Sequence, residues 1–284
     1  MNYFRARTVD EVLGRLAERP PPRVICGATD LFADPALLPA KYEWVDISRV
    51  DALRAIERRD GMARIGSATT WEAIAATEWL PTALREAAAS VGSRQIRVQG
   101  SIGGNLCHAS PVADGVPPLL ALDAHVELAS TRGVRRLPLT EFLLGRRRTS
   151  LHADELLVAV WFALPRAQDR TAFIKCTNRD GAAIAVVSAA VRLRMSGEDT
   201  MDAVAISVGG VSETALRMRE LEAAMQGQRR AGLARAIEEA SLVELTPIDD
   251  CRAPAAHRIH LARLAIGRAF SHCIKETDRG VSTA

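Results

Sequence analysis

The sequence predicts an α+β fold: a mixed α/β domain over residues 1 to about 165, then a smaller α+β domain over residues 170–284. In the first part, segments with helical and strand patterns are mixed, and glycine-rich turns lie at strand ends. The second part opens with two long runs of alternating apolar residues, typical of antiparallel strands, and ends in helices. With 284 residues, 48% of them hydrophobic, the chain can form two or three compact units.

The first elements carry clear start and stop signals. Thr8 is placed as a helix N-cap with Glu11 at capping-box spacing, and the prolines at 20–22 end that helix. The segment "RVIC" predicts a short buried strand that runs into a glycine turn and a helix start in "GATDL". Further strands are expected in "YEWVDIS" and "ARIGSATT", and helices in "TWEAIAATEW" and "LPTALREAAASVGS", the second ending at Gly92.

Later elements follow the same reasoning. The segments "LDAHVELAS" and "GVRRLPLTEF" predict a hairpin around Arg132 and Gly133, and "LLVAVWFAL" predicts a strand that Pro165 stops. Two long antiparallel strands are expected in "GAAIAVVSAAVRLRM" and "MDAVAISVGGV". Helices are expected in "ALRMRELEAAMQG", in "AGLARAIEEASLVEL" and from Ala255 onward, where apolar residues recur at helical spacing.

Composition excludes several classes of function. The net charge of +3 and the 4% aromatic content argue against a nucleic-acid binder. The sequence has no apolar run of roughly 20 residues and no secretory signal in "MNYFRARTVDEV", so a cytoplasmic protein is expected. The five cysteines are dispersed without a CxxC pair, which predicts reduced, mostly buried thiols and no metal site.

Two glycine-containing segments stand out: Gly27–Asp30 and Gly100–Asn105. Successive glycines let backbone N–H groups approach an anion, so the two segments could clamp a pyrophosphate; simple tight turns are the alternative. Neither segment has the Gly-Lys-Ser/Thr of a P-loop or the GxGxxG of a dinucleotide-binding turn. The residues alone therefore indicate only a phosphate-bearing ligand.

Nearly the whole chain, residues 1 to about 275, resembles the FAD-binding subunit of the molybdenum hydroxylases, the family of xanthine dehydrogenase, carbon monoxide dehydrogenase and quinoline oxidoreductase. The resemblance rests on segments that share the family's order and spacing. They are "VICGATDL", "WVDISRVDAL", "IGSATTWEAIA", "RQIRVQGSIGGNLCHASPVADGVPPLLAL", "RRTSLHADELLVAV", "FIKCTNRDGAAIAVVSAAVRL" and "AISVGGVSETALR".

The resemblance implies a fold and a cofactor site. The fold is a two-lobed α/β FAD-binding domain of the PCMH/vanillyl-alcohol-oxidase type, with lobes at about 1–55 and 56–165, then a C-terminal domain with a three-stranded antiparallel sheet and helices. FAD is expected between the lobes, its pyrophosphate on the two glycine segments, Asp114 near its adenosine half, and Leu151 and Lys175 near the flavin. The residues expected at FAD are Val24, Ile25, Cys26, Gly27, Ala28, Thr29, Asp30, Leu31, Val91, Gly92, Ser101, Ile102, Gly103, Gly104, Asn105, Asp114, Leu151 and Lys175.

The resemblance also implies a function. The chain would pass electrons from a large molybdopterin subunit and a small [2Fe–2S] subunit through FAD to NAD+, O2 or another acceptor, in a dimer of heterotrimers. A xanthine, purine or N-heterocycle is the expected substrate; no catalytic side chain and no metal ligand is expected on this chain. The alternatives are a self-sufficient flavoenzyme of the vanillyl-alcohol-oxidase superfamily, which would need its own acid–base residue, and a flavin-free scaffold.

Several other residues have a structural and a functional interpretation. Many relatives have a second glycine where this chain has Ala28, so we expect Ala28 at a φ that alanine accepts. Cys107 and His108 are interpreted as packing residues, and His257 and His260 as a solvated helix face. The arginines at 146–148 are expected in a solvated loop, an interface or a gate, Asp154–Glu155 in a solvated turn, and Arg179 near the flavin edge.

Overall fold

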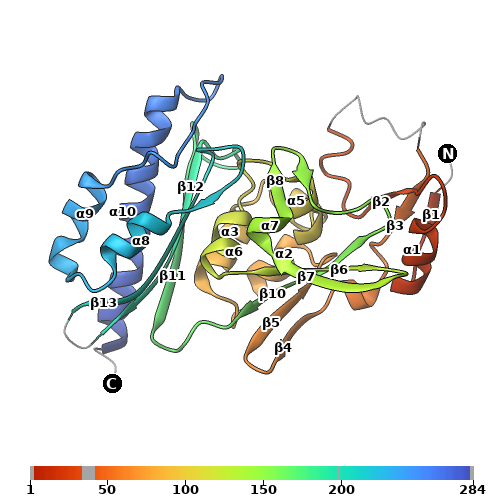
Figure 1. The fold of residues 1–284 in the computed structure, drawn as a ribbon, viewed down its shortest axis with the longest axis horizontal. Coiled ribbons are helices and arrows are strands. Elements are labelled where there is room, and N and C mark those ends of the chain that lie inside the picture. The colour runs from red at the N-terminus through yellow and green to blue at the C-terminus, as the bar shows by residue number, and fades with distance from the viewer. Residues whose placement is uncertain (1–2, 34–41, 197–198, 282–284) are drawn as a thin grey trace.

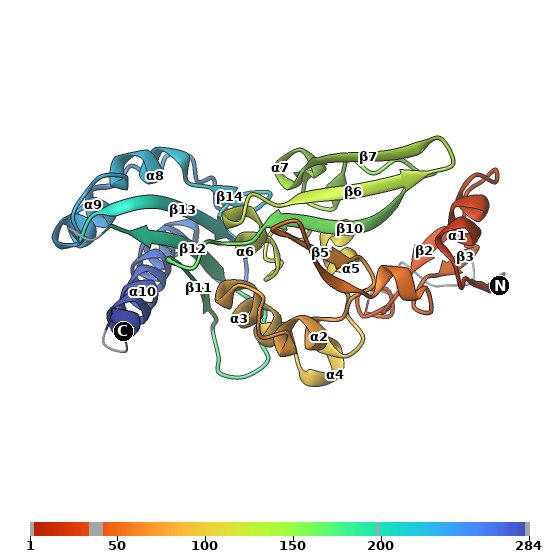
Figure 2. The same cartoon turned by 90° about the horizontal axis from the view of Figure 1, so that it is seen from below.

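The computed structural model describes residues 3–33, 42–196 and 199–281. Three sheets follow one another along the long axis of the molecule, with the N-terminal sheet at one end and the C-terminal helices at the other (Figure 1). Helices separate the second sheet from the third (Figure 2). The mixed helix and sheet composition agrees with the predicted class, whereas the division near residue 165 stays a prediction.

The first sheet is small and parallel. Its strands are β1 (Tyr3–Arg5), β3 (Trp44–Asp46) and β2 (Arg23–Ile25), with β3 buried in the middle. Helix α1 (Val9–Leu16) begins at Thr8, whose hydroxyl accepts the Glu11 N–H. The Glu11 carboxylate accepts from the N–H of Arg7 rather than Thr8, so the predicted capping box is offset by one residue. β2 is an edge strand with exposed side chains, so the prediction that it is buried is wrong.

The second sheet is antiparallel, in the order β4-β5-β10-β6-β7, and β6 and β7 form the hairpin predicted around Gly133. A core of apolar side chains lies between it and the helices that follow β5 in the chain. The strands are β4 (Ile56–Arg59), β5 (Met62–Gly66), β6 (His125–Ser130), β7 (Gly133–Pro138) and β10 (Leu156–Ala163). The helices are α2 (Trp71–Ala76), α3 (Thr82–Ser90), α4 (Arg94–Arg97), α5 (Ile102–His108), α6 (Val116–Ala121) and α7 (Leu139–Phe142). A short hairpin, β8 (Leu143–Gly145) and β9 (Arg148–Thr149), and a 3₁₀ turn, η3 (Asp51–Leu53), complete this part.

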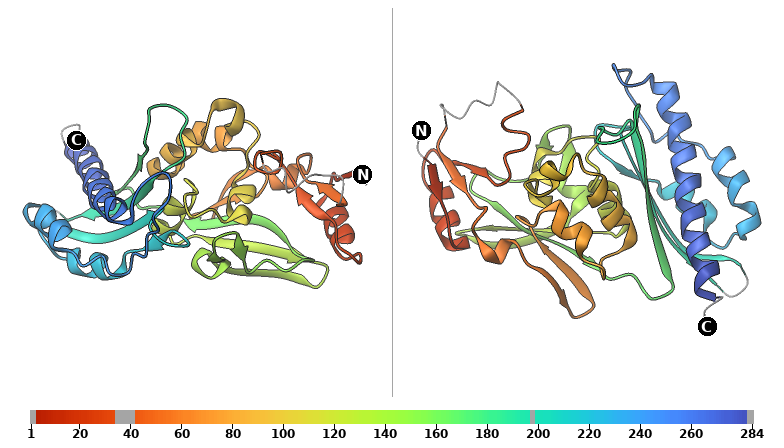
Figure 3. Two further views of the ribbon diagram at one scale, coloured as in Figure 1. Left: turned by 90° about the horizontal axis from the view of Figure 1, so that it is seen from above. Right: turned by 180° about the vertical axis from the view of Figure 1, so that it is seen from behind.

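The third sheet confirms the two long antiparallel strands that alternation predicts, β12 (Val187–Met195) and β13 (Met201–Gly209). A third long strand, β11 (Asp169–Cys176), which was not predicted from alternation, pairs with β12. A two-residue strand, β14 (Leu216–Arg217), makes the sheet four-stranded rather than three-stranded. Helix α10 (Ala255–Val281) packs along one face, as Figure 3 shows from behind. The same core includes side chains of α8 (Arg219–Met225) and α9 (Leu233–Glu239), and the 3₁₀ turn η4 (Arg230–Gly232) precedes α9.

The other face of the third sheet packs on α3 and α6. Small side chains fill this interface: Ala83 and Ala87 of α3 lie against Ala190 and Ala205 of the sheet. The N–H of Ala83 donates to the hydroxyl of Thr171 on β11 at 3.0 Å. Because alanine side chains let backbones approach closely, the end of β11 and the end of α3 lie side by side. No helix in the described part of the chain is long and apolar enough to cross a bilayer.

Candidate functional site

The two glycine segments lie against each other. A Cβ atom placed on Gly27 would lie 1.9 Å from the carbonyl oxygen of Gln99, and one on Gly100 would lie 3.8 Å from the Thr29 hydroxyl. The loop after β2 is therefore packed on the segment that leads into α5. Residues 29–33 of this loop form turns, so the helix start predicted in "GATDL" is wrong over the described residues.

Ala28 adopts a left-handed conformation with φ of +55°. The expectation of an ordinary φ at this position is therefore wrong. The tight turn needs the conformation that a glycine would adopt freely, and alanine adopts it at a cost because its Cβ approaches the backbone carbonyl. The turn keeps its shape through the N–H of Phe32, which donates to the carbonyl of Ala28 at 3.2 Å.

The second segment is a helix start rather than a loop. Ser101 is the N-cap of α5, and its hydroxyl accepts the N–H of Gly104 at 3.1 Å. The N–H of Gly103 donates to the carbonyl of Ser67 at 2.8 Å, so this amide already has a partner within the protein. The two glycines differ in surroundings. Gly103 is buried against Ser67, whereas Gly104 is exposed, and a Cβ atom added to Gly104 would lie close only to the Ser101 hydroxyl.

The first loop and α5 also meet through side chains. Nε2 of His108, at the end of α5, lies 3.9 Å from Oδ1 of Asp30. Cys107 is exposed, so the packing interpretation of that residue is wrong. Cys273 is the buried one of the five thiols, which also contradicts the expectation that most are buried. Burial in the first loop raises the pKa of Cys26, which therefore stays a thiol.

Asp114 and Lys175 form an ion pair across the interface between the second and third sheets. Nζ of Lys175 donates to Oδ2 of Asp114 at 2.6 Å and to the carbonyl of Ser90 at 3.0 Å. Asp114 is 8% exposed, and burial raises the pKa of its carboxyl to about 6 although the Lys175 ammonium favours the ionised form. An extended dinucleotide cannot bring both of its ends to one ion pair. The expected positions, Asp114 at the adenosine end and Lys175 at the flavin end, stay a prediction, against which this ion pair argues.

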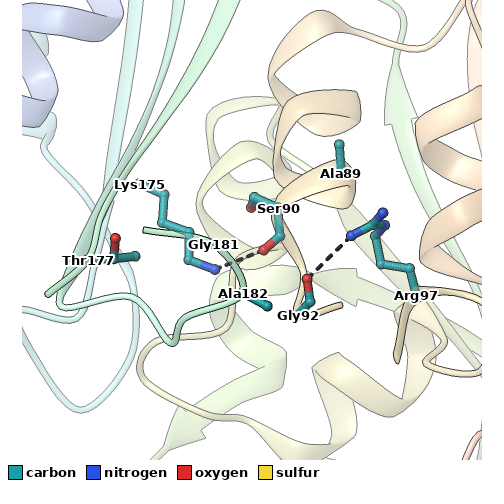
Figure 4. Close-up of a pocket in the computed structure, with 8 residues that line it drawn as sticks. All are labelled: Ala89, Ser90, Gly92, Arg97, Lys175, Thr177, Gly181 and Ala182. Atoms are coloured by element: carbon teal, nitrogen blue, oxygen red, sulfur yellow. Dashed lines mark hydrogen bonds between the residues drawn. The ribbon is translucent and has the colours of Figure 1, made fainter. Parts of the chain in front are cut away.

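A cavity of about 350 Å³ opens beside this pair. Figure 4 shows Lys175 reaching toward Ser90 at the end of α3, with Gly181 and Ala182 of the loop after β11 lining the same cavity. Arg97 of α4 donates to the carbonyl of Gly92 at 3.3 Å, and Gly92 itself is left-handed at φ of +47°. The lining residues are Ala89, Ser90, Gly92, Arg97, Lys175, Thr177, Gly181 and Ala182.

The remaining predicted site residues lie around these two groups. Val24 and Ile25 belong to β2 and lead into the first loop, which Leu31 continues. Val91 and Leu151 are partly buried against the core under the second sheet, and Ile102 is inside it. Arg179 is exposed in the loop between β11 and β12, and its side chain does not line the cavity.

Sequence reasoning missed Ser90 and Arg97 as cavity residues. Arg97 lies in the quoted segment "RQIRVQGSIGGN", yet its place in the cavity depends on the turn that Gly92 makes. Ser90 contributes its backbone carbonyl, which carries no signal in the sequence.

Other polar residues have structural partners. The rings of His257 and His260 are exposed, with centroids 6.3 Å apart, and the described residues hold no cluster of three or more metal-ligating side chains. Glu155 is buried and bound to Arg135, which lowers its pKa to about 2, so the solvated-turn prediction is wrong for this residue. The arginines at 146–148 are exposed in the β8–β9 hairpin.

Several buried side-chain oxygens around the candidate site have no hydrogen-bond partner in the described part of the chain. They belong to Ser67, Thr69, Asn105 and Asp114. Such groups are normally paired in folded proteins, so unpaired ones indicate a place where a ligand completes the hydrogen bonding. FAD carries hydroxyls and an imide N–H that can donate to these oxygens. The residues present therefore fit this cofactor.

Two family models together match almost the whole chain. The model described as the FAD binding domain in molybdopterin dehydrogenase matches residues 1–166. The model described as the CO dehydrogenase flavoprotein C-terminal domain matches residues 172–273. The chain belongs to the FAD-binding subunits of the molybdenum hydroxylase family. It is thus a flavoprotein subunit of a multi-subunit oxidoreductase, and FAD is its cofactor.

Members of this family resemble the chain over most of its length. The xanthine dehydrogenase FAD-binding subunit of Escherichia coli O157:H7 is 31% identical over 280 residues, covering 96% of each chain. The nicotinate dehydrogenase FAD-subunit of Eubacterium barkeri is 31% identical over 237 residues, covering 79% of each. Quinoline 2-oxidoreductase from Pseudomonas putida 86 superposes with a TM-score of 0.88 at 27% identity, over 98% of each chain.

Proposed function

We propose that the chain is the electron-transferring subunit of a molybdenum hydroxylase that oxidises xanthine, another purine or a related N-heterocycle. The observation that carries this proposal is the 31% identity over 96% of the length to a xanthine dehydrogenase FAD-binding subunit. The similarity to a nicotinate dehydrogenase subunit points to the same class of ring substrate. The partners would be a large molybdopterin subunit and a small [2Fe–2S] subunit, in a dimer of heterotrimers.

The predicted residues of this chain would hold FAD between the first loop and α5. Phosphate oxygens would lie against the exposed Gly104, where the N–H now bound by the Ser101 hydroxyl could donate to them instead. Ser67, Thr69 and Asn105 would supply acceptors for hydroxyl groups. Asp114 and Lys175 would contact one and the same end of the cofactor. Val91 and Leu151 would provide apolar contacts beside them.

Bound FAD supplies a carrier that accepts electrons and releases them to an acceptor such as NAD+ or O2. The protein's part is to position that carrier, to shield it from water and to set its surrounding charge. Lys175 and Asp114 provide one such charged pair at the cavity, and Arg97 provides a second cation. No side chain of this chain needs to act as acid or base on the organic substrate.

The test is purification of the chain alone and together with its large and small partner subunits. The proposal expects a yellow chain with about one FAD per chain. It also expects xanthine or nicotinate to reduce the flavin only when both partners are present. A chain that binds no FAD, or whose flavin an organic substrate reduces without partners, contradicts the proposal.

A further inference from the structure

Arg258 is a fully buried arginine on α10 with no place in the site described above. Its side chain is 2% exposed, although arginine is rarely buried without a specific function in the fold. It does not contact the candidate cofactor residues. The partners of its guanidinium group indicate what it holds in place.

The guanidinium joins three segments that are distant in the sequence. Its Nη1 donates to the carbonyl of Val186 at 2.6 Å and to the carbonyl of Gly210 at 3.1 Å. Its Nη2 donates to Oδ1 of Asp250 at 2.6 Å. Asp250 is in turn held by the backbone N–H groups of Arg252 and Ala253, at 2.8 and 3.2 Å. The planar fork of arginine suits this arrangement, because its donors point in defined directions.

Val186 ends the loop 177–186, which connects β11 to β12 and lines the cavity beside Lys175. The side chains of Thr177, Asn178 and Ile184 in this loop are exposed, whereas Ala185 and Val186 at its end are buried, so apolar packing holds only that end. A second side-chain link again runs to the segment before α10: Nδ2 of Asn178 donates to the carbonyl of Arg252 at 2.7 Å. Both ends of the loop are thus tied to one structural unit, residues 250–258.

We propose that Arg258, paired with Asp250, is a positioning residue that holds the loop 177–186 over the cavity beside Lys175, with Asn178 as a second tie. This pair, here called the clamp, joins α10 to the segment before it and acts by holding the loop, without touching a ligand. Removing it would leave the carbonyls of Val186 and Gly210 without this donor in a buried place, which destabilises the position of the loop and favours its local opening. If FAD occupies this cavity, as the proposed function states, the clamp limits the access of solvent to it.

The proposal is tested by hydrogen exchange of the backbone amides of residues 177–186 in the purified full chain. Arg258→Met removes the clamp, and Asn178→Ala removes the exposed tie without disturbing the core. For Asn178→Ala we expect exchange in the loop to be about fivefold faster, since one net hydrogen bond is lost. For Arg258→Met we expect a larger increase. His257→Ala, an exposed neighbour on the same helix, is the matched control and leaves the loop unchanged.

A second measurement is quenching of the fluorescence of bound FAD by iodide, which increases in both variants if the loop shields the cofactor. If Arg258→Met does not fold, Asn178→Ala still decides the matter. Loop exchange in Asn178→Ala equal to that of the unchanged protein would overturn the proposal. The exchange experiment does not depend on FAD, so a chain without FAD would contradict the proposed function and leave the test of the clamp intact.

Discussion

The backbone of Gly27 lies directly against the carbonyl of Gln99, where a Cβ atom on residue 27 would be 1.9 Å from the oxygen. The contact joins the first loop to the segment that leads into α5, the two segments expected to hold the pyrophosphate. Both sides of the contact are backbone, so neither can rotate away as a side chain would. The two halves of the candidate site stay together only while residue 27 has no side chain.

Replacing Gly27 by alanine should therefore separate the two segments. We expect the purified Gly27→Ala variant to lose most of its FAD and to be less stable by about 1–3 kcal/mol, the usual cost of an overpacked contact. The flavin absorbance per chain and urea unfolding measure the two effects. Gly14→Ala is the matched control: it lies exposed in α1, nothing lies within 4 Å of its added Cβ, and it should keep its FAD.

The two glycines at the start of α5 should behave differently. A Cβ on Gly103 would lie 2.6 Å from the carbonyl oxygen of Ser67, so Gly103→Val should destabilise the fold itself. Gly104 is exposed, so Gly104→Val should leave the unfolding transition nearly unchanged and release FAD by filling the space expected for a phosphate. Thermal unfolding and flavin absorbance of the two variants separate these effects. Full flavin absorbance in folded Gly104→Val would contradict the pyrophosphate assignment.

Local patterns predicted the elements that depend on local chemistry. The Thr8 cap, the hairpin at Gly133 and the long strands β12 and β13 all follow from spacing of polar, glycine and apolar residues within the segment. The cofactor could be predicted only from the family resemblance, because two glycine segments without a known motif indicate no more than an anion-binding site. Sequence patterns could not show that Ser101–Asn105 starts a helix, since Gly103 is stabilised there by the carbonyl of Ser67, a tertiary contact.

The contacts between distant segments were not predictable. Asp114 and Lys175 are separated by 61 positions, and their ion pair depends on how α3 and α6 pack on the third sheet across the alanine interface. In the sequence, nothing distinguishes Arg258 from the other charged residues of the helix. Its guanidinium is buried because it donates to the carbonyls of Val186 and Gly210, which lie far from residue 258 in the sequence.

Ala28 should be a site where glycine stabilises the chain. Its φ of +55° costs alanine about 1–2 kcal/mol, whereas glycine adopts it freely and loses part of that gain through its greater freedom in the unfolded chain. We expect Ala28→Gly to raise the free energy of unfolding by about 0.5–1 kcal/mol, measured by urea unfolding, with FAD retained. Gly61→Ala, at φ of +75° in an exposed turn, should show the opposite sign. Lower stability in Ala28→Gly would contradict the left-handed conformation.

Burial of Asp114 has a consequence for the pH dependence of stability. The pKa of its carboxyl is about 6 in the folded protein, whereas an aspartate in an unfolded chain has a pKa of about 3.9. Between these two values the folded state binds more protons than the unfolded state. The free energy of unfolding should therefore fall as the pH rises through this window, by roughly 2–3 kcal/mol in total from this group.

Asp114→Asn removes that titration. We expect the free energy of unfolding of this variant to change less between about pH 4 and pH 6 than that of the unchanged protein, as measured by urea unfolding at a series of pH values. Lys175 then lacks its carboxylate partner, so FAD content should fall as well if the pair contacts the cofactor. Asp180→Asn, an exposed aspartate in the neighbouring loop, is the control for the removal of one carboxyl. An identical pH profile for Asp114→Asn and the unchanged protein would show that Asp114 does not titrate in this window.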